Sequence, residues 1–251
     1  MILVHSFPTN SIILNGVKEY LSSYFKVHFI DLPGFIKSRR PLLEISLLNY
    51  STFVKEEITK LKLKDFYLGG ISFGFLVVNK LAENSKCKGV IAMEPFLGSK
   101  YLRMSFVKKM IYQKIIRIIN KYQLQKYIWK TNIFRKIILK DVPNKYLQII
   151  LQEIHPRTFF ETAEILLTHN ETIKIKTKKP YVVLLNPKDR TIDASETLKT
   201  LQQKINRDHL LVINTTAEHF PKDISNGYFE KHLKKESLEK IVKRIKVNVK
   251  N

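Results

Sequence analysis

Apolar and polar residues follow two different periods along this chain. Short apolar runs that are typical of buried strands occur at residues 1–6, 26–30, 65–69, 89–93, 181–185 and 209–213. Between them, apolar residues recur at helical spacing over residues 12–25, 47–61, 73–83, 194–205 and from about Tyr228 onward. Strands that alternate with helices in this way favour a mostly parallel central sheet flanked by helices. The sequence therefore predicts an α/β fold.

The alternation stops between about Ser99 and His169. Only helical periodicity continues there, with apolar residues such as Val107, Ile111 and Ile115. The strand pattern resumes after Lys179-Pro180, and no low-complexity linker intervenes. We therefore expect one α/β core, formed by residues 1–98 and 170–251, that carries an all-helical insertion at residues 99–169.

Composition narrows the class of protein. A chain of 251 residues with 44% hydrophobic residues can bury a substantial core. No run approaches the roughly 18 apolar residues that would span a bilayer. The single cysteine, Cys87, cannot form an intramolecular disulfide, and the first residues, MILVHSF, lack the pattern of a signal peptide. These features predict a cytoplasmic protein.

The charge is strongly positive, with 44 Lys and Arg against 22 Asp and Glu. Residues 99–168 hold 14 of these basic residues and 4 of the acidic ones, so the predicted insertion carries +10 of the +22. Lysine on a solvated surface explains such an excess without a partner. The basic amphipathic pattern of residues 101–129 is also found on membrane-surface helices, so association with an anionic membrane stays open. Nucleic acid is disfavoured because no nucleic-acid-binding motif accompanies the charge.

A nucleophile motif stands at Gly70-Ile71-Ser72-Phe73-Gly74, between the strand at 65–69 and the helix that follows it. This is the context of the G-x-S-x-G elbow, a tight turn that strains the serine backbone and points its hydroxyl outward. The helix N-terminus would offer an N–H to an oxyanion beside Ser72. The motif predicts Ser72 as a nucleophile. The alternative is a glycine-rich turn whose serine only caps a helix.

A nucleophilic serine requires a histidine base and a carboxylate, which in this motif follow in the order serine, acid, histidine. Asp189 comes directly after the strand at 181–185, and His219 follows the strand at 209–213. The carboxyl ends of parallel strands meet at one edge of a sheet. We therefore expect Asp189 and His219 to lie close to Ser72.

Together these motifs resemble the α/β-hydrolase-fold superfamily over nearly all of the chain outside the insertion. His5-Ser6-Phe7-Pro8-Thr9 resembles the H-G-x-P segment that closes the oxyanion hole, and Asp31-Leu32-Pro33-Gly34-Phe35 with Ser38 resembles the D-x-P-G-x-G-x-S loop. By this resemblance Ser72 is the nucleophile, His219 the general acid/base and Asp189 its orienting partner. The resemblance further implies that the backbone N–H groups of Phe7 and Phe73 form the oxyanion hole. The insertion falls where this superfamily keeps its cap, or lid.

The chain departs from the family pattern at three places. Ser6 and Ile36 stand where the family usually has glycine, and the Ser6 side chain would either crowd the oxyanion loop or add a hydrogen bond to it. The chain also opens directly on the strand before this loop, whereas family members commonly begin with a two-stranded hairpin. We expect this abbreviation to thin one edge of the sheet without changing the site.

A second acidic residue competes for the orienting role. Glu94 follows the strand at 89–93, where several haloalkane dehalogenases and other relatives carry their acid. We favour Asp189 over Glu94, since one carboxylate is enough to hold the imidazole, and Asp193 is a weaker candidate. Dehalogenation itself is disfavoured because those relatives use an aspartate nucleophile.

The sequence therefore predicts a serine hydrolase that cleaves a carboxylic ester, with a hydrophobic acyl or alkyl group, through an acyl-enzyme. Thioester, amide or carbon–carbon bond hydrolysis by the same triad remains an alternative, as does a non-catalytic ligand-binding or membrane-surface protein on the same scaffold. No cofactor or metal is expected, because no His/Cys cluster has ligand spacing and no phosphate-binding glycine loop is present.

Overall fold

The structure of the chain is a computed structural model that describes residues 1–137, 139, 142–170, 173–175, 178–221, 223–233 and 235–247. The ranges expected for the insertion and for the second half of the core each include a few positions outside these residues, among them 138, 140, 141 and 248–251.

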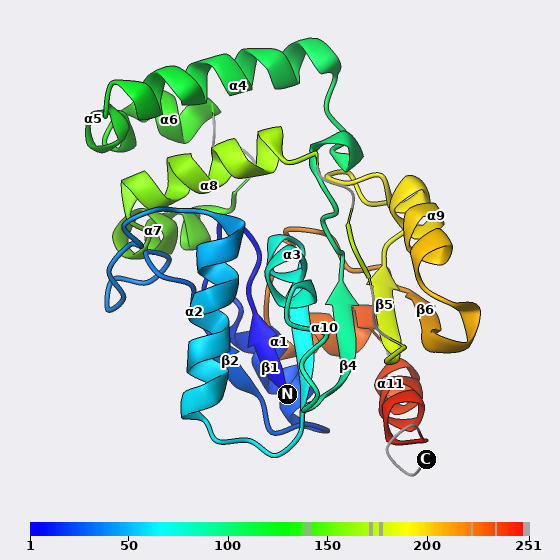
Figure 1. The fold of residues 1–251 in the computed structure, drawn as a ribbon. Coiled ribbons are helices and arrows are strands. Elements are labelled where there is room, and N and C mark those ends of the chain that lie inside the picture. The colour runs from blue at the N-terminus through cyan, green and yellow to red at the C-terminus, as the bar shows by residue number, and fades with distance from the viewer. Residues whose placement is uncertain are drawn as a thin grey trace.

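A parallel sheet of six strands forms the centre of the described chain (Figure 1). The strands are β1 (Ile2–Val4), β2 (His28–Ile30), β3 (Phe66–Ile71), β4 (Cys87–Met93), β5 (Tyr181–Leu185) and β6 (Leu210–Asn214), in the spatial order β2-β1-β3-β4-β5-β6. All five strand pairs are parallel. Strands such as β1 and β5 are buried at every position, as expected for apolar runs covered on both faces. The predicted α/β fold is confirmed.

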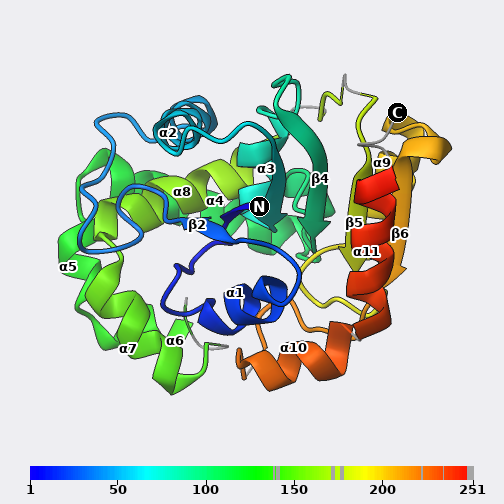
Figure 2. The same ribbon diagram turned by 90° about the horizontal axis from the view of Figure 1, so that it is seen from below.

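Helices cover both faces of this sheet (Figure 2). They are α1 (Asn15–Ser22), α2 (Leu47–Lys60), α3 (Phe73–Asn79), α9 (Ala194–Lys204), α10 (Asn226–Leu233) and α11 (Lys235–Val247). Figure 2 shows α2 and α3 on one face, with α1 and α10 on the other. At the start of α2, the Ser46 side chain caps the helix by accepting a hydrogen bond from Asn49 N.

The strand order reverses between β1 and β3. From β1 the chain proceeds to β2 on one side, whereas β3 pairs with the other side of β1. The loops at the carboxyl ends of these two strands therefore diverge and leave a crevice, the usual position of a binding site in an open α/β sheet. Ser72 directly follows β3, and His5 directly follows β1.

Residues 99–169 lie above the carboxyl edge of the sheet (Figure 1). They contain the short 3-10 helix η1 (Ser99–Tyr101) and the helices α4 (Phe106–Lys121), α5 (Gln125–Trp129), α6 (Asn132–Ile137), α7 (Asn144–Glu153) and α8 (Pro156–Thr168). The two ends of this segment meet, because Ser99 N donates a hydrogen bond to His169 O at 2.7 Å. None of the described helices is long and apolar enough to cross a membrane.

The end of the chain differs from expectation. The sequence predicts one final helix from about Tyr228, whereas the structure has α10 from Asn226 and α11 from Lys235 as separate elements. Continuous helical periodicity cannot reveal such a division, because each helix alone satisfies the pattern.

Candidate active site

Ser72 occupies the turn between β3 and α3 with φ of 47° and ψ of −112°. Backbone atoms of this turn lie close to one another and to the end of β1. A Cβ on Gly74 would lie 2.4 Å from Val4 O, and one on Gly70 would lie 2.6 Å from Phe75 N, so both positions require glycine. Ser72 N donates to Met93 O at 2.9 Å, which ties the turn to β4.

His219 lies between Ser72 and Asp189. Its Nε2 is 2.8 Å from Ser72 Oγ, and its Nδ1 is 2.9 Å from Asp189 Oδ2. An ionised carboxylate only accepts hydrogen bonds, so Nδ1–H donates to Asp189 and leaves Nε2 to accept from the serine hydroxyl. Three loops that are distant in sequence are thus joined by two hydrogen bonds.

Asp189 is fully buried and is held from its other side. Its Oδ1 accepts hydrogen bonds from Thr191 N at 2.5 Å and Ile192 N at 3.0 Å. Burial alone would raise the pKa of Asp189, but the hydrogen bond and charge of His219, with the two backbone N–H groups, outweigh it and lower the pKa. Asp189 is therefore an ionised partner for the imidazole at neutral pH.

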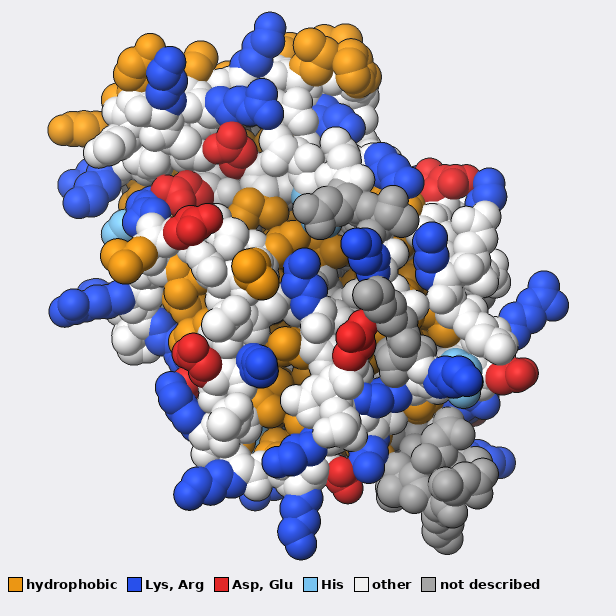
Figure 3. Space-filling model, in the orientation of Figure 1, with side chains coloured by type: hydrophobic (Ala, Val, Ile, Leu, Met, Phe, Trp, Pro, Cys, Tyr) orange, Lys and Arg blue, Asp and Glu red, His pale blue; other side chains and the backbone are white. Residues whose placement is uncertain are grey.

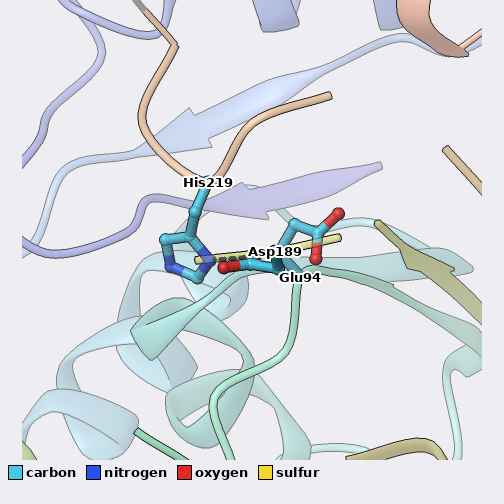
Figure 4. A group of neighbouring side chains, drawn as sticks. All are labelled: Glu94, Asp189 and His219. Atoms are coloured by element: carbon cyan, nitrogen blue, oxygen red, sulfur yellow. Dashed lines mark hydrogen bonds and ion pairs between the residues drawn. The ribbon is translucent and has the colours of Figure 1, made fainter. Parts of the chain in front are cut away.

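Glu94 stands next to this pair (Figure 4). Ligand atoms of Glu94, Asp189 and His219 lie within 4.8 Å of one another, yet the hydrogen bond to the imidazole comes from Asp189. Glu94 Oε1 instead accepts from Asn186 N at 2.7 Å. Burial and the charge of nearby Asp189 raise the pKa of Glu94 to about 9. Glu94 therefore holds a proton at neutral pH.

These three residues could in principle ligate a metal ion, but their hydrogen bonds and protonation favour a site without one. The imidazole Nδ1 already donates to Asp189, and a carboxyl group that retains its proton is a poor metal ligand. Asp193, the third acid considered from the sequence, caps α9 through a hydrogen bond from Glu196 N.

The loop after β1 contains the Phe7 N–H expected in the oxyanion hole. Ser6, which replaces a family glycine, adds a hydrogen bond: its Oγ lies 2.9 Å from Thr9 Oγ1, and the Thr9 hydroxyl donates to Ser6 O. His5 fixes the same loop, because its Nε2 accepts from Leu32 N at 3.0 Å and its Nδ1 bonds Ser6 O at 2.8 Å. Burial lowers the pKa of His5, so it links the two loops as a neutral imidazole.

The Phe73 N–H is the first of α3, where a helix offers no internal acceptor for a backbone N–H. Phe7 and Ser72 both line the same cavity. The position of Phe73 agrees with the expected oxyanion hole, and the roles of Phe7 and Phe73 stay predictions.

A cavity of about 650 Å³ opens from Ser72 and His219. It lies between the sheet edge and the helices of residues 99–169. Apolar side chains dominate its wall, and none of the described lining residues is Asp, Glu, Lys or Arg. The large side chains among them are Phe7, Phe96, Tyr112, Phe134, Phe159, Phe160 and Phe220. This volume falls within the range of about 300–1,000 Å³ that small-molecule sites occupy.

Comparison with known proteins bears on the fold first. Residues 1–116 match the sequence family described as alpha/beta hydrolase fold. An esterase from Thermogutta terrifontis has a similar structure, with a TM-score of 0.65 and 17% identity over 98% of this chain and 89% of that one. The chain has an α/β-hydrolase fold. The α/β-hydrolase fold expected from the sequence motifs is thereby confirmed.

Hydrolase-fold relatives differ in their chemistry. An epoxide hydrolase from Bacillus megaterium matches with a TM-score of 0.65 and 14% identity, over 98% of this chain and 92% of that one. The pimeloyl-[acyl-carrier protein] methyl ester esterase of Aeromonas salmonicida is 34% identical over 83 residues, which are 33% of this chain and 31% of that protein. The aligned part thus covers about a third of the length of the curated relatives that the chain matches.

The structure brings Ser72, His219 and Asp189 together, as expected from the sequence, but the residues around them could not be expected in the same way. The contacts of Glu94 with Asn186 and Thr215 join loops after three different strands, and no local motif signals them. The wall of the cavity also escaped it, because residues such as Phe134 and Phe159 enter the site only through the packing of separate helices.

Proposed function

We propose that this hydrolase-fold chain is a serine hydrolase that cleaves carboxylic esters with a hydrophobic acyl or alkyl group. The observation that carries the proposal is the chain of hydrogen bonds from Ser72 Oγ through His219 to buried Asp189, at the end of an uncharged cavity of about 650 Å³. The esterase names of relatives add support.

In the proposed reaction, His219 Nε2 takes the proton of Ser72 Oγ as the serine attacks the ester carbonyl. The N–H groups of Phe7 and Phe73 stabilise the oxyanion. Protonated His219 then gives its proton to the leaving alcohol, and the acyl-enzyme remains. Water, deprotonated by His219, releases the acid and restores the serine. Asp189 holds the imidazole in the required tautomer throughout.

The wall of the cavity supports the choice of substrate class. An apolar chain loses water on entering it, whereas a charged group would be buried there without a counter-ion. We further propose that residues 99–169 act as the cap, since residues on α4 and α8 close the cavity over Ser72. A cytoplasmic location and the absence of nucleic-acid binding stay predictions.

A fluorophosphonate probe tests the nucleophile. The native protein is expected to be labelled at one serine, and Ser72→Ala to lose the label completely, because no other hydroxyl of the described residues bonds His219. Ser51→Ala provides a matched control, since Ser51 is equally buried but bonds only backbone carbonyls. If Ser72→Ala were labelled like the native protein, or if the native protein were not labelled, the hydrolase proposal would fail in favour of a non-catalytic ligand-binding protein.

A series of p-nitrophenyl esters tests the substrate class. We expect kcat/KM to rise from acetate to medium-length acyl chains, by roughly fourfold for each added methylene until the cavity is filled, since a buried methylene contributes about 0.8 kcal/mol. Flat or falling values along the series would contradict the hydrophobic-ester assignment. Faster turnover of matched thioesters or amides would indicate that the protein is a thioester or amide hydrolase, an alternative that the same three residues allow.

A further inference from the structure

Helix α4 carries apolar side chains on two faces. Its inner face, with Ile116 and Ile119, is buried and lines the cavity. Its outer face bears a continuous stripe at i, i+4, i+8, i+11 and i+15 that points to solvent. The stripe consists of Val107 (65% exposed), Ile111 (50%), Ile115 (43%), Ile118 (52%) and Tyr122 (63%).

Basic side chains adjoin this outer stripe. Lys114 and Lys121 follow one side of it at helical spacing, with Arg117 between them, and Lys108 lies on the other side. All four are exposed. The sequence contains 12 Lys and Arg between residues 95 and 140 and no Asp or Glu. Arg117 Nε lies 3.5 Å from Glu164 Oε1, and this part of the surface still combines exposed apolar area with a large excess of positive charge.

Of the outer stripe, Ile115 also lines the cavity, whereas Val107, Ile111, Ile118 and Tyr122 are not among its described lining residues. A cap helix needs one apolar face toward the crevice, and Ile116 and Ile119 already supply it. Solvent-facing lysine would keep the opposite face wet, yet this face carries large apolar side chains instead. Figure 1 shows α4 as the outermost element on its side of the molecule, and Figure 3 shows apolar side chains with Lys and Arg among them at that crest.

We infer that the outer face of α4 docks the protein on an anionic phospholipid surface. The inference rests on this surface alone and does not require the proposed reaction. An exposed apolar stripe bordered by lysines is the composition of helices that lie in the plane of the membrane interface: the apolar side chains enter the acyl boundary while the lysines meet phosphate and acidic headgroups.

Charge complementarity decides among possible occupants. A second copy of the chain would bring another strongly positive face against this one, and like charges in contact oppose association. Nucleic acid would meet the lysines but would gain nothing from the branched aliphatic side chains of the stripe. An anionic bilayer satisfies both kinds of side chain at once.

Co-sedimentation of the full chain with vesicles tests the inference. We expect binding to vesicles of phosphatidylcholine with phosphatidylglycerol, little binding to phosphatidylcholine alone, and weaker binding as salt rises. Ile111→Ser/Ile118→Ser and Lys114→Gln/Lys121→Gln are each expected to lower the partition coefficient roughly tenfold or more, since apolar insertion and charge both contribute. Neither isoleucine lines the cavity.

Matched controls use exposed residues away from α4. Leu43→Ser/Leu48→Ser removes two leucines that are 96% and 66% exposed, and Lys55→Gln/Lys240→Gln removes two exposed lysines. Both are expected to bind vesicles like the native protein. Circular dichroism and short-ester turnover report whether each variant is folded.

Three outcomes would overturn the inference. The first is equal loss of binding in the α4 variants and their controls, which would indicate nonspecific charge. The second is that the protein does not sediment with vesicles at low salt and instead forms a dimer in sedimentation velocity, which Ile111→Ser/Ile118→Ser dissociates. The third is that the protein does not bind vesicles but binds an oligonucleotide, and that only Lys114→Gln/Lys121→Gln loses this oligonucleotide binding. None of these readouts depends on catalysis, so failure of the proposed reaction is separately recognisable.

Discussion

Ser72 is held in a backbone conformation that a serine rarely adopts. Its φ of 47° with ψ of −112° lies outside the regions that L-residues favour, and such residues cost about 1–3 kcal/mol unless their surroundings hold them. Here the backbone N–H bonds Met93 O, and the carbonyl accepts from Phe75 N and Phe96 N. Both backbone polar groups of Ser72 thus form hydrogen bonds within the fold, and its hydroxyl faces His219.

Glu94 is the residue whose ionisation differs most from its ordinary behaviour within the site. It is 8% exposed, and ionising it would place a second negative charge beside Asp189. A neutral carboxyl avoids this repulsion and still accepts the hydrogen bond from Asn186 N. We therefore interpret Glu94 as a neutral side chain that holds the loop after β5 through Asn186 N, and Asp189 as the charged partner of His219.

The raised pKa of Glu94 makes stability depend on pH. The unfolded chain ionises this group near its ordinary pKa of 4.5, whereas the folded chain keeps the proton until about pH 9. The contribution of Glu94 to the free energy of unfolding is therefore complete below pH 4.5 and is lost as pH rises toward 9. The free energy of unfolding falls over this range by at most about 1.4 kcal/mol per pH unit. We predict that Glu94→Gln, which imitates the neutral acid, flattens this decline in urea unfolding measured between pH 5 and pH 8.5.

The control for this prediction is Glu239→Gln, at an exposed position on α11. It should retain the pH dependence of the native protein. Ester turnover should survive Glu94→Gln because Asp189 keeps its hydrogen bond to the imidazole. An unchanged pH dependence in Glu94→Gln would show that Glu94 is ionised in the folded protein, and a loss of turnover comparable to that of Asp189→Asn would make it the orienting acid.

At the scale of elements, the position of Ser72 depends on how closely α3 approaches β1. Gly74 allows that approach, since its Cα faces the carbonyl oxygens of Val4 and His5. A side chain there would push the first turn of α3 away from the loop that carries Phe7. The turn at Ser72 and the loop that carries Phe7 are therefore positioned by one contact between a helix and a strand end.

Gly74→Ala tests this contact. The added methyl would lie 2.4 Å and 2.5 Å from two backbone oxygens, which cannot rotate aside, and we predict a loss of about 1–3 kcal/mol in the free energy of unfolding. Gly227→Ala is the matched control, because no atom lies within 4 Å of the added methyl in α10. There the free energy of unfolding should stay constant or rise by up to about 1 kcal/mol. Equal stability of the two variants in denaturant titrations would contradict the close approach.

The expected proximity of three side chains at one edge of the sheet has a physical basis at this same scale. Ser72, Asp189 and His219 each directly follow a strand, and parallel strands end at one edge, so local pattern and sheet geometry together bring them close. The state of Glu94 could not be predicted in this way, because it depends on burial and on contacts with residues about 90 and 120 positions away. The cavity depends on packing between helices, which periodicity alone does not specify.

For the molecule as a whole, charge and chemistry are separated in space. The cavity wall has no described charged residue, while residues 99–168 above it carry 14 basic and 4 acidic residues. The remaining +12 is spread over the rest of the chain. The positive charge therefore bears on what the outer surface meets and has no part in the proposed bond cleavage, which uses a serine, a histidine and one buried carboxylate.

The adjoining ends of residues 99–169 have a consequence for how this protein can be changed. Because Ser99 and His169 are joined by a backbone hydrogen bond, the segment departs from the sheet and returns to it at one point. A short connector could bridge that point without displacing a strand. Much of the cavity wall and the hydrogen-bonded Ser72, His219 and Asp189 then belong to separate segments of the chain. An exchanged helical segment would bring a new cavity wall and a new outer surface to an unaltered Ser72, His219 and Asp189.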